Sequence, residues 1–436
     1  MNSDNLKFVL RELSERPLHK GHARDLSIPT DTGKVVGLSG VRRCGKTFLF
    51  FETMRQLMER GVPRERIVYL NFEDDRLHPI AANELDQVLR CQRELFAAAR
   101  TGRIYLFLDE VQSAPEWQRW VRRLHDTEDI SIFVTGSSSD LLQRDLSAAM
   151  RGRSITLDVF PLSFREFLRF RGIVPRDHDA NSENEVRAAL AEFLRWGGFP
   201  EVVVAAPELR PLILDEYASL MLWRDLVERH AIRNENVMRA LLRHCFRNTA
   251  SLLSLNKLHR DLESMGVSAG KNTLFDYCAM LEEGGLVHLL PVHDGSVRRQ
   301  TRNPRKLHVV DPGLATAFAA RAETDLGRRL ESVVFLQCRR RSRVWHYALG
   351  EHEIDLCDAE GSAFVNTCWN LVDPLTMNRE EAALQFARTT LPAATGVLLW
   401  QEAVVDIEQR IPGSRPVWRW LLEQPGSSLE ANRVGL

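Results

Sequence analysis

The chain has 436 residues, of which 44% are hydrophobic and 27% are charged, and its formal net charge is −1. This length predicts about two to four domains with buried cores. A net charge near zero excludes a surface that attracts nucleic acid as a whole, so any basic patch must be local.

The seven cysteines are scattered without C-x-x-C spacing, which argues against a disulfide framework or a structural zinc site. The first residues lack the cationic and apolar segments of a secretory leader, and no run approaches the ~18 apolar residues of a membrane span. We therefore expect a cytoplasmic protein that makes no contact with a membrane.

The most informative segment is an apolar run, Val35–Ser39, that leads into a Gly-x-x-x-x-Gly-Lys-Thr pattern and then a helical pattern. A strand, glycine loop and helix in this order direct backbone N–H groups and the positive end of the helix dipole at a phosphate. Lys46 is expected to reach the β- and γ-phosphates of ATP, and the Thr47 hydroxyl is expected to bind Mg²⁺. The pattern predicts these phosphate-binding residues: Gly40, Val41, Arg42, Arg43, Cys44, Gly45, Lys46 and Thr47.

A second apolar run, Ile104–Leu108, is typical of a strand that is buried on both faces, and it ends in Asp109 and Glu110. Asp109 is expected to hold Mg²⁺ together with Thr47. Glu110 is expected to orient or deprotonate the attacking water. The alternative is that the two carboxylates cap the helix that follows them.

A third strand, Ile130–Val134, is followed by a cluster of hydroxyl residues. Ser137 in this cluster would sense the γ-phosphate or position water, but the same hydroxyls would equally well cap the next helix. Arg153, or its neighbour Arg151, is a candidate arginine finger from the same chain or from a neighbouring subunit. The alternative for Arg153 is a surface arginine paired with an acidic residue.

Several segments together resemble the bacterial and archaeal AAA-type ATPases that carry a C-terminal domain of unknown function, which are similar to STAND switch ATPases. The resemblance runs from Val35 to beyond Arg379. It implies a P-loop domain, a winged-helix segment and a nuclease-like C-terminal fold. The segments that carry it are Gly40–Thr47, Tyr69–Asp74, Phe107–Gln112, Val134–Ser138, Pro161–Phe167, Gly197–Pro200, Trp223–Asp225, Asp311–Leu314 and Glu353–Asp355.

Residues 255–310 show the order helix, turn, helix and hairpin, which is typical of a winged helix. Its basic hairpin loop, with Arg298 and Arg299, and the helix start at Lys271 would contact DNA phosphates. Winged helices in AAA-type proteins also act as lids or interaction modules, so this alternative stays open.

The last part of the chain has an α+β pattern, in which Glu331 and the strand residues Glu351, Glu353 and Asp355 would provide carboxylates for a metal. Restriction-type nucleases place an acid-x-lysine pair on the next strand, where this chain has Asn366-x-Cys368. We therefore expect a degenerate nuclease fold that is used for binding or packing.

The predicted fold class is α/β, with an AAA-type P-loop parallel sheet, a helical and winged-helix domain, and an α+β restriction-nuclease-like domain. The expected domains are residues 1–200, 201–320 and 321–436. The expected function is Mg²⁺-dependent ATP hydrolysis that drives a conformational switch. The alternatives are a nucleotide-gated DNA-binding regulator with negligible turnover, and a DNA-cleaving effector. Further expected partners are DNA, another protein and a second copy of the chain.

Overall fold

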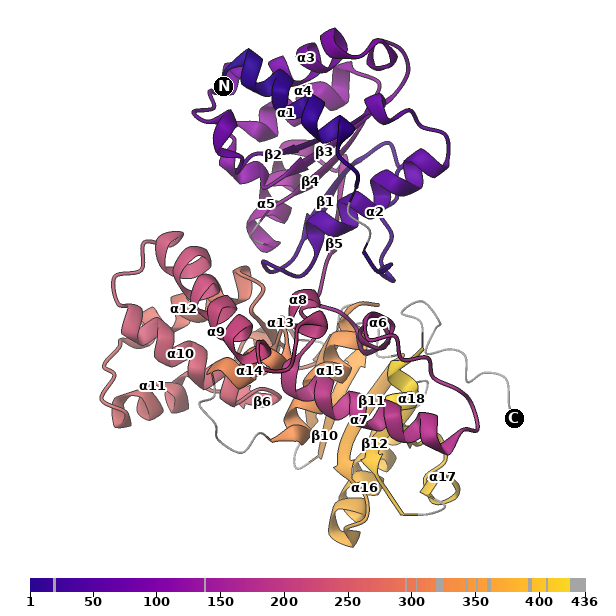
Figure 1. The fold of residues 1–436 in the computed structure, drawn as a ribbon. Coiled ribbons are helices and arrows are strands. Elements are labelled where there is room, and N and C mark those ends of the chain that lie inside the picture. Colours follow the sequence, from indigo (N-terminus) through magenta and orange to yellow (C-terminus); the bar gives the residue numbers. More distant parts are fainter. Residues whose placement is uncertain are drawn as a thin grey trace. The chain divides into compact units, whose positions relative to one another are not determined.

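The computed structural model describes residues 1–18, 21–136, 139–294, 296–302, 304–318, 325–341, 344–349, 352–358, 362–390, 394–404 and 407–423. Contacts divide the described residues into two compact units, Met1–Phe160 with Glu283–Gly285, and Pro161–Glu282 with Leu286–Leu436 (Figure 1). The predicted domain boundaries at residues 200 and 320 stay predictions. None of the described helices is both long and apolar enough to cross a membrane.

The first unit is built on a five-stranded parallel sheet with the order β2-β3-β4-β1-β5. This sheet confirms the predicted α/β P-loop fold. Its strands are β1 (Val35–Ser39), β2 (Ile67–Asn71), β3 (Ile104–Asp109), β4 (Ile130–Thr135) and β5 (Ser154–Asp158). Its helices are α1 (Ser3–Glu15), α2 (Lys46–Glu59), α3 (Gln87–Leu95), α4 (Trp117–Thr127) and α5 (Ser139–Met150).

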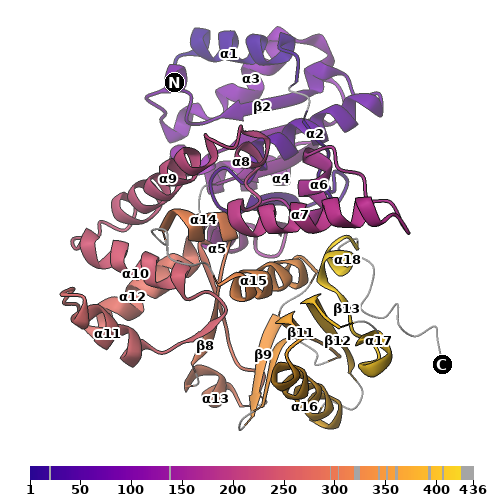
Figure 2. The same cartoon turned by 60° about the horizontal axis from the view of Figure 1, so that its bottom comes forward.

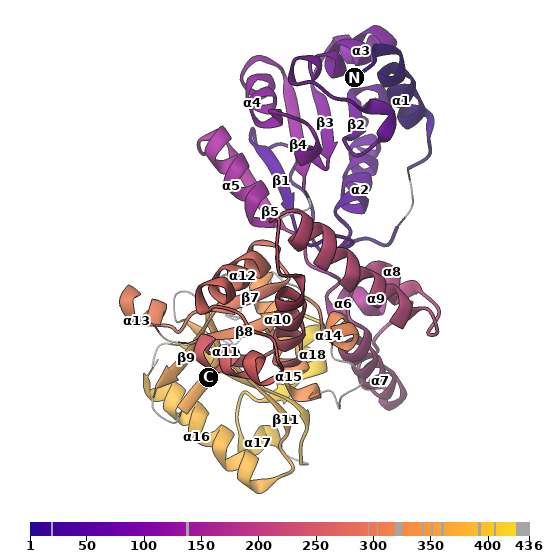
Figure 3. The same ribbon diagram turned by 90° about the vertical axis from the view of Figure 1, so that its left-hand side faces the viewer.

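Both faces of this sheet are covered, which explains why its central strands are continuously apolar. On one face, Leu106 and Leu108 of β3 join a core that α4 and α5 also line. On the other face, the Phe107 ring stacks on Phe133 with 4.5 Å between centroids and meets Phe50 of α2 at 5.1 Å. Figure 3 shows α4 and α5 on one side of the sheet and α2 on the other.

The parallel arrangement decides which residues can meet. Residues that follow β1, β3 and β4 lie at the carboxyl edge of the sheet, whereas residues that precede β5 lie at the opposite edge. The glycine loop after β1 and the acidic pair at the end of β3 therefore share one edge.

The second unit begins with helices and continues into a three-stranded antiparallel sheet of order β6-β8-β7. Its first helices are α6 (Phe164–Phe170), α7 (Ala180–Trp196), α8 (Pro200–Val204), α9 (Arg210–Leu220) and a π-helical turn (Met221–Glu228). The following elements are α10 (Glu235–Arg247), β6 (Ser251–Leu253), α11 (Leu255–Ser264), α12 (Lys271–Glu283), β7 (Val287–Leu290), α13 (Val297–Arg302), β8 (Arg305–Val309) and α14 (Pro312–Phe318). The predicted order of two helices and a hairpin is confirmed. Strand β6 and helix α13 were not predicted, and the winged-helix assignment itself stays a prediction.

The rest of the second unit is a five-stranded mixed sheet of order β13-β12-β11-β10-β9, with α15 and α16 on opposite sides (Figure 2). The predicted α+β character is confirmed, and the nuclease-like assignment stays a prediction. The elements are α15 (Leu326–Arg339), β9 (Val344–Leu349), β10 (His352–Asp358), β11 (Ala363–Asn370), α16 (Pro374–Thr390), β12 (Thr395–Glu402), α17 (Ile407–Arg410), β13 (Arg415–Pro416) and α18 (Val417–Leu421).

Two glycine-containing segments of the second unit are packed against each other around Asp311. The buried Asp311 carboxylate accepts hydrogen bonds from the backbone N–H groups of Gly198 (2.7 Å) and Gly313 (2.8 Å). Burial raises the pKa of Asp311 to about 7, although these hydrogen bonds oppose the shift. A Cβ atom on Gly198 would lie 2.4 Å from the Leu162 carbonyl oxygen, so only glycine fits this approach.

Candidate functional site

The glycine loop has the backbone geometry that a phosphate cradle requires. Gly45 has a φ of 103°, and helix α2 begins at the next residue, Lys46. A Cβ atom on Gly40 would lie 2.2 Å from the carbonyl oxygen of Val159, so this position also accepts only glycine. The Lys46 ammonium donates hydrogen bonds to the carbonyl oxygens of Gly40 (2.8 Å) and Val41 (3.1 Å). Lys46 therefore lies over the glycine loop, where it is expected to bind the phosphates.

Asp109 at the end of β3 is held by hydroxyl groups from neighbouring segments. Thr47 Oγ1 donates a hydrogen bond to Asp109 Oδ2 over 2.7 Å, and Tyr69 donates to the same oxygen over 3.0 Å. Thr135 at the end of β4 donates to Oδ1. Residue Asp109 is 2% exposed. The structure thus brings together Thr47 and Asp109, the two residues predicted to bind Mg²⁺.

Tyr69 was missed as a site residue, and Thr135 belonged to the predicted hydroxyl cluster after the third strand, although only Ser137 of that cluster was named for the site. Tyr69 lies on β2, and Thr135 is the last residue of β4, two positions before the predicted Ser137. The signal for Thr135 was a hydroxyl at the tip of a buried strand, which the sequence did show. Ser137 lies outside the described residues.

Glu110 follows Asp109 with a left-handed φ of 52°, and its N–H donates to Thr135 Oγ1 over 3.1 Å. Burial raises the pKa of Glu110, while the Lys46 charge and a 2.5 Å hydrogen bond from Gln112 oppose the shift. A carboxylate with a raised pKa binds a proton more readily, as a general base must. Its position beside Lys46 places it near the glycine loop.

The arginines of the loop lie close to the site. The Arg42 guanidinium is 3.8 Å from the Glu73 carboxylate, and its charge is among those that lower the pKa of Glu110. Arg43 adopts a φ of 65°. Arg24, which was not predicted, donates hydrogen bonds to the carbonyl oxygens of Cys44 (2.9 Å) and Phe160 (2.8 Å). Arg24 therefore ties the loop to the segment that leaves β5.

The prediction that Arg153 acts as an arginine finger in its own chain is wrong. Arg153 precedes β5, and its carbonyl oxygen accepts a 3.0 Å hydrogen bond from the N–H of Val35, the first residue of β1. Its guanidinium pairs with Asp126. Strands rise ~3.3 Å per residue, so the full length of β1 separates Arg153 from the glycine loop. A role for Arg153 in a neighbouring subunit stays a prediction.

A second cluster of charges lies in the second unit, around Lys306 of β8. The Lys306 ammonium, whose residue is 3% exposed, lies 2.6 Å from Glu331 Oε1 and 3.0 Å from Asp355 Oδ1. Asp355 Oδ2 accepts a 2.8 Å hydrogen bond from the Thr367 N–H. The structure thus brings Glu331 and Asp355 together as predicted, but with a lysine between them. Glu351 and the Glu353 side chain lie outside the described residues.

Comparisons with known proteins agree with the architecture of the first unit. A family model described as an AAA domain matches residues 32–168, and a model described as a domain of unknown function (DUF8612) matches residues 187–325. An uncharacterized protein of Methanocaldococcus jannaschii is 30% identical over 415 residues, which cover 92% of this chain and 90% of that protein. An uncharacterized protein of Haemophilus influenzae is 28% identical over 312 residues, which cover 71% of this chain and 76% of that protein.

Among solved structures, the Walker-type ATPase of Pyrococcus abyssi is 14% identical with a TM-score of 0.41, and the match covers 72% of this chain and 94% of that chain. The glycine loop, the acidic strand end and the AAA match come from the same unit. This chain belongs to the family of AAA-type P-loop ATPases in which a domain of unknown function follows the AAA domain.

Proposed function

We propose that the chain binds ATP with Mg²⁺ at the edge of the first sheet and hydrolyses it. The observation that carries this proposal is the 2.7 Å hydrogen bond between Thr47 Oγ1 and Asp109 Oδ2, next to the Lys46 ammonium on the glycine loop. A hydroxyl and a carboxylate are the hard oxygen donors that Mg²⁺ prefers, so the residues present fit this ion. When bound, Mg²⁺ neutralises charge on the phosphates.

Each side chain has a separate task in this mechanism. The loop N–H groups and Lys46 bind the phosphates of ATP and compensate the charge that develops during transfer. Thr47 and Asp109 would hold the metal. Glu110 accepts the proton of the attacking water, and Thr135 orients the segment because it bonds both Asp109 and the Glu110 N–H.

We further propose that the nucleotide state changes the segment that leaves β5. The N–H of Val159 donates a hydrogen bond to Ser39 over 2.6 Å, and Arg24 joins Cys44 to Phe160. Gly40 packs directly on the Val159 carbonyl. A change in the conformation of the glycine loop would therefore displace Val159 and the segment that ends the first unit. This coupling is the physical basis that we suggest for a conformational switch.

Replacing Glu110 separates binding from hydrolysis. Glu110→Gln keeps the shape of the side chain and removes the base, so ATP turnover should fall by about 10²–10⁴-fold while ATP affinity is kept. Glu116→Gln is the matched control, because Glu116 is exposed and pairs with Arg119. Phosphate release and equilibrium ATP binding are the two measurements.

Two results would contradict this mechanism. Turnover in Glu110→Gln equal to that of the wild type would remove Glu110 from its assigned role. Wild-type protein that binds ATP without releasing phosphate would favour the alternative, a nucleotide-gated regulator.

The nuclease alternative is less well supported. The Lys306 ammonium lies between Glu331 and Asp355 and neutralises the negative charge that would otherwise bind a metal ion. Metal-dependent DNA cleavage by the wild type that is lost in Asp355→Ala would support the nuclease alternative. Contact of DNA with Lys271 and the basic hairpin loop stays a prediction.

A further inference from the structure

Helix α10 presents three arginines, Arg239, Arg243 and Arg247, at intervals of four residues. Four residues correspond to a rise of about 6 Å, so the three side chains follow one side of the helix. Their guanidinium groups make no ion pair or hydrogen bond with any residue that the structure describes. A row of arginines without acidic partners is a strong local positive charge in a chain whose net charge is −1.

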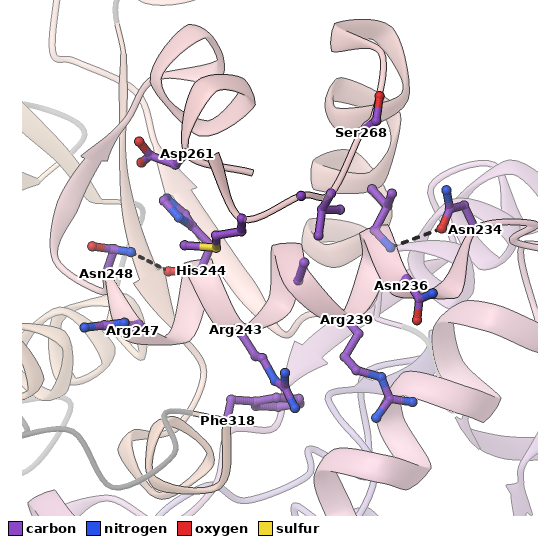
Figure 4. Close-up of a pocket in the computed structure, with 15 residues that line it drawn as sticks. Asn234, Asn236, Arg239, Arg243, His244, Arg247, Asn248, Asp261, Ser268 and Phe318 are labelled. Atoms are coloured by element: carbon purple, nitrogen blue, oxygen red, sulfur yellow. Dashed lines mark hydrogen bonds between the residues drawn. The ribbon is translucent and has the colours of Figure 1, made fainter. Parts of the chain in front are cut away.

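These arginines line a pocket of about 950 Å³ (Figure 4). The turn between α11 and α12, Met265–Ser268, borders the pocket on one side, and Phe318 borders it on the other. Figure 4 shows Arg239 and Arg243 projecting to the same side of α10. Asp261 is the one carboxylate among the described residues that line the pocket.

His244 adds no positive charge to the pocket at neutral pH. Burial lowers the pKa of His244, Asp261 opposes the shift, and Lys257 and Arg247 add to it. The charge of the described lining therefore comes from the three arginines against Asp261, and it favours an anionic ligand.

Helix α12, which a winged helix would place in a DNA groove, has the opposite charge balance. It carries Lys271 against Asp276 and two glutamates, and the Lys271 ammonium is bonded to Asn256 over 2.9 Å. Phe275 on this helix is 62% exposed. A helix surface with an exposed phenylalanine and no excess of positive charge is unfavourable for contact with phosphates.

The hairpin loop between β7 and β8 is also partly neutralised. Arg299 lies 3.1 Å from the Asp294 carboxylate, and Arg305 lies 3.5 Å from the Glu282 carboxylate. Among the described side chains of these three segments, α10 carries three arginines without a partner, whereas the hairpin loop carries one, Arg298.

We propose that the α10 pocket binds the phosphodiester backbone of single-stranded nucleic acid through Arg239, Arg243 and Arg247. A concave site admits a single strand more easily than the broad backbone of a duplex. The Phe318 ring and Met265 offer apolar surfaces for unstacked bases, which is how proteins bind single strands without reading their sequence. The proposal is independent of ATP hydrolysis, because binding is measured without turnover.

The test is fluorescence anisotropy of a labelled 20-nucleotide single-stranded DNA with the full-length chain, at several salt concentrations. Arg243→Ala should weaken binding about tenfold, because a charge-assisted contact is lost. The triple variant Arg239→Ala/Arg243→Ala/Arg247→Ala should also make the slope of log K against log[salt] shallower by about 2, since each phosphate contact contributes about 0.7. Arg243→Lys should keep most of the affinity because it keeps the charge.

The matched control is Arg328→Ala/Arg388→Ala, which removes two exposed arginines that do not line the pocket and should leave affinity unchanged. A duplex of the same sequence should bind at least about tenfold more weakly. The proposal is overturned if the triple variant, with an unchanged melting temperature, binds like the wild type. Loss of affinity in the control, preference for the duplex, or no binding by the wild type at low salt would overturn it equally.

Discussion

Thr135 has a central position in the candidate site because its hydroxyl serves two partners. It donates to Asp109 and accepts from the Glu110 N–H, so it sets the orientation of both acidic residues. Thr135→Val keeps the shape and leaves a buried N–H and a carboxylate oxygen without this partner. Loss of such contacts costs about 1.5–3 kcal/mol, so we expect turnover to fall by about ten- to a hundredfold.

The measurement is steady-state ATP hydrolysis, with Ser131→Ala on the same strand as the control. Ser131 lies at the other end of β4 and donates to the Thr30 carbonyl over 3.2 Å. Equal turnover in Thr135→Val and in Ser131→Ala would show that the Thr135 hydroxyl has no role.

The raised pKa of Glu110 has a consequence for the pH dependence of hydrolysis. A general base works when it is deprotonated, so activity should fall as the pH drops through a value above that of an ordinary glutamate. Gln112→Ala removes a hydrogen bond that lowers this pKa, so the acidic limb of the kcat profile should move to higher pH. An acidic limb at the same or a lower pH in this variant would contradict the assignment.

Lys306 compensates the negative charge of Glu331 and Asp355 in the second unit. Lys306→Met would leave Glu331 and Asp355 without a cation, and breaking a buried ion pair in this way typically costs about 3–5 kcal/mol. Urea unfolding should show this loss, whereas Lys257→Met at an exposed position should change stability little. Restored stability in Lys306→Met/Glu331→Gln/Asp355→Asn would support the charge argument. A loss below about 1 kcal/mol in the single variant would refute it.

At the scale of elements, strands β7 and β8 place two histidines directly opposite each other, His288 and His308. Burial lowers the pKa of His288 to about 3, with the Arg339 charge adding to the shift. Burial also lowers the pKa of His308, and Lys306, His288 and His346 add to it. The folded protein therefore keeps both rings neutral under conditions in which the unfolded chain would protonate them.

The sign of the pH effect follows from these shifts. Above about pH 6.5 the two histidine rings are neutral in both the folded and the unfolded protein. Below this pH the rings bind protons only in the unfolded chain, so the free energy of unfolding decreases as the pH falls. Between pH 6.5 and pH 5 the loss of unfolding free energy from His288 should be about 2 kcal/mol, and His308 should add to this loss. His308→Gln should make the difference in unfolding free energy between pH 7 and pH 5 smaller, whereas His259→Gln should not, because His259 lies outside this pair. A wild-type stability that is equal at both values would contradict the prediction.

At the scale of the whole molecule, the chain consists of two units, and the residues expected to bind nucleotide all come from the first. Mg-ATP should therefore stabilise the first unit directly, by about 2.7 kcal/mol at 100 times the dissociation constant. Hydrogen exchange should show added protection in β1, β3 and α2, and Lys46→Ala should abolish it. Protection that persists in Lys46→Ala would place the nucleotide elsewhere. Altered exchange in the second unit would support the proposed switch.

The amino-acid sequence by itself determined the parallel α/β unit, the glycine loop and the acidic pair. These features depend on residues that are consecutive in the chain, because strand burial, the start of α2 and the tip of β3 are all local patterns. The same local patterns predicted two helices and a hairpin in the second unit.

Only the tertiary structure decided which distant residues meet. The parallel pairing of β1 and β5 moved Arg153 to the edge opposite the glycine loop, and strand order brought Tyr69 and Thr135 to Asp109. Lys306 reaches Glu331 and Asp355 from a strand that precedes them in the chain. Strand register and long-range packing depend on many weak contacts between segments that are distant in the chain. The periodicity of apolar residues within one segment does not predict these contacts.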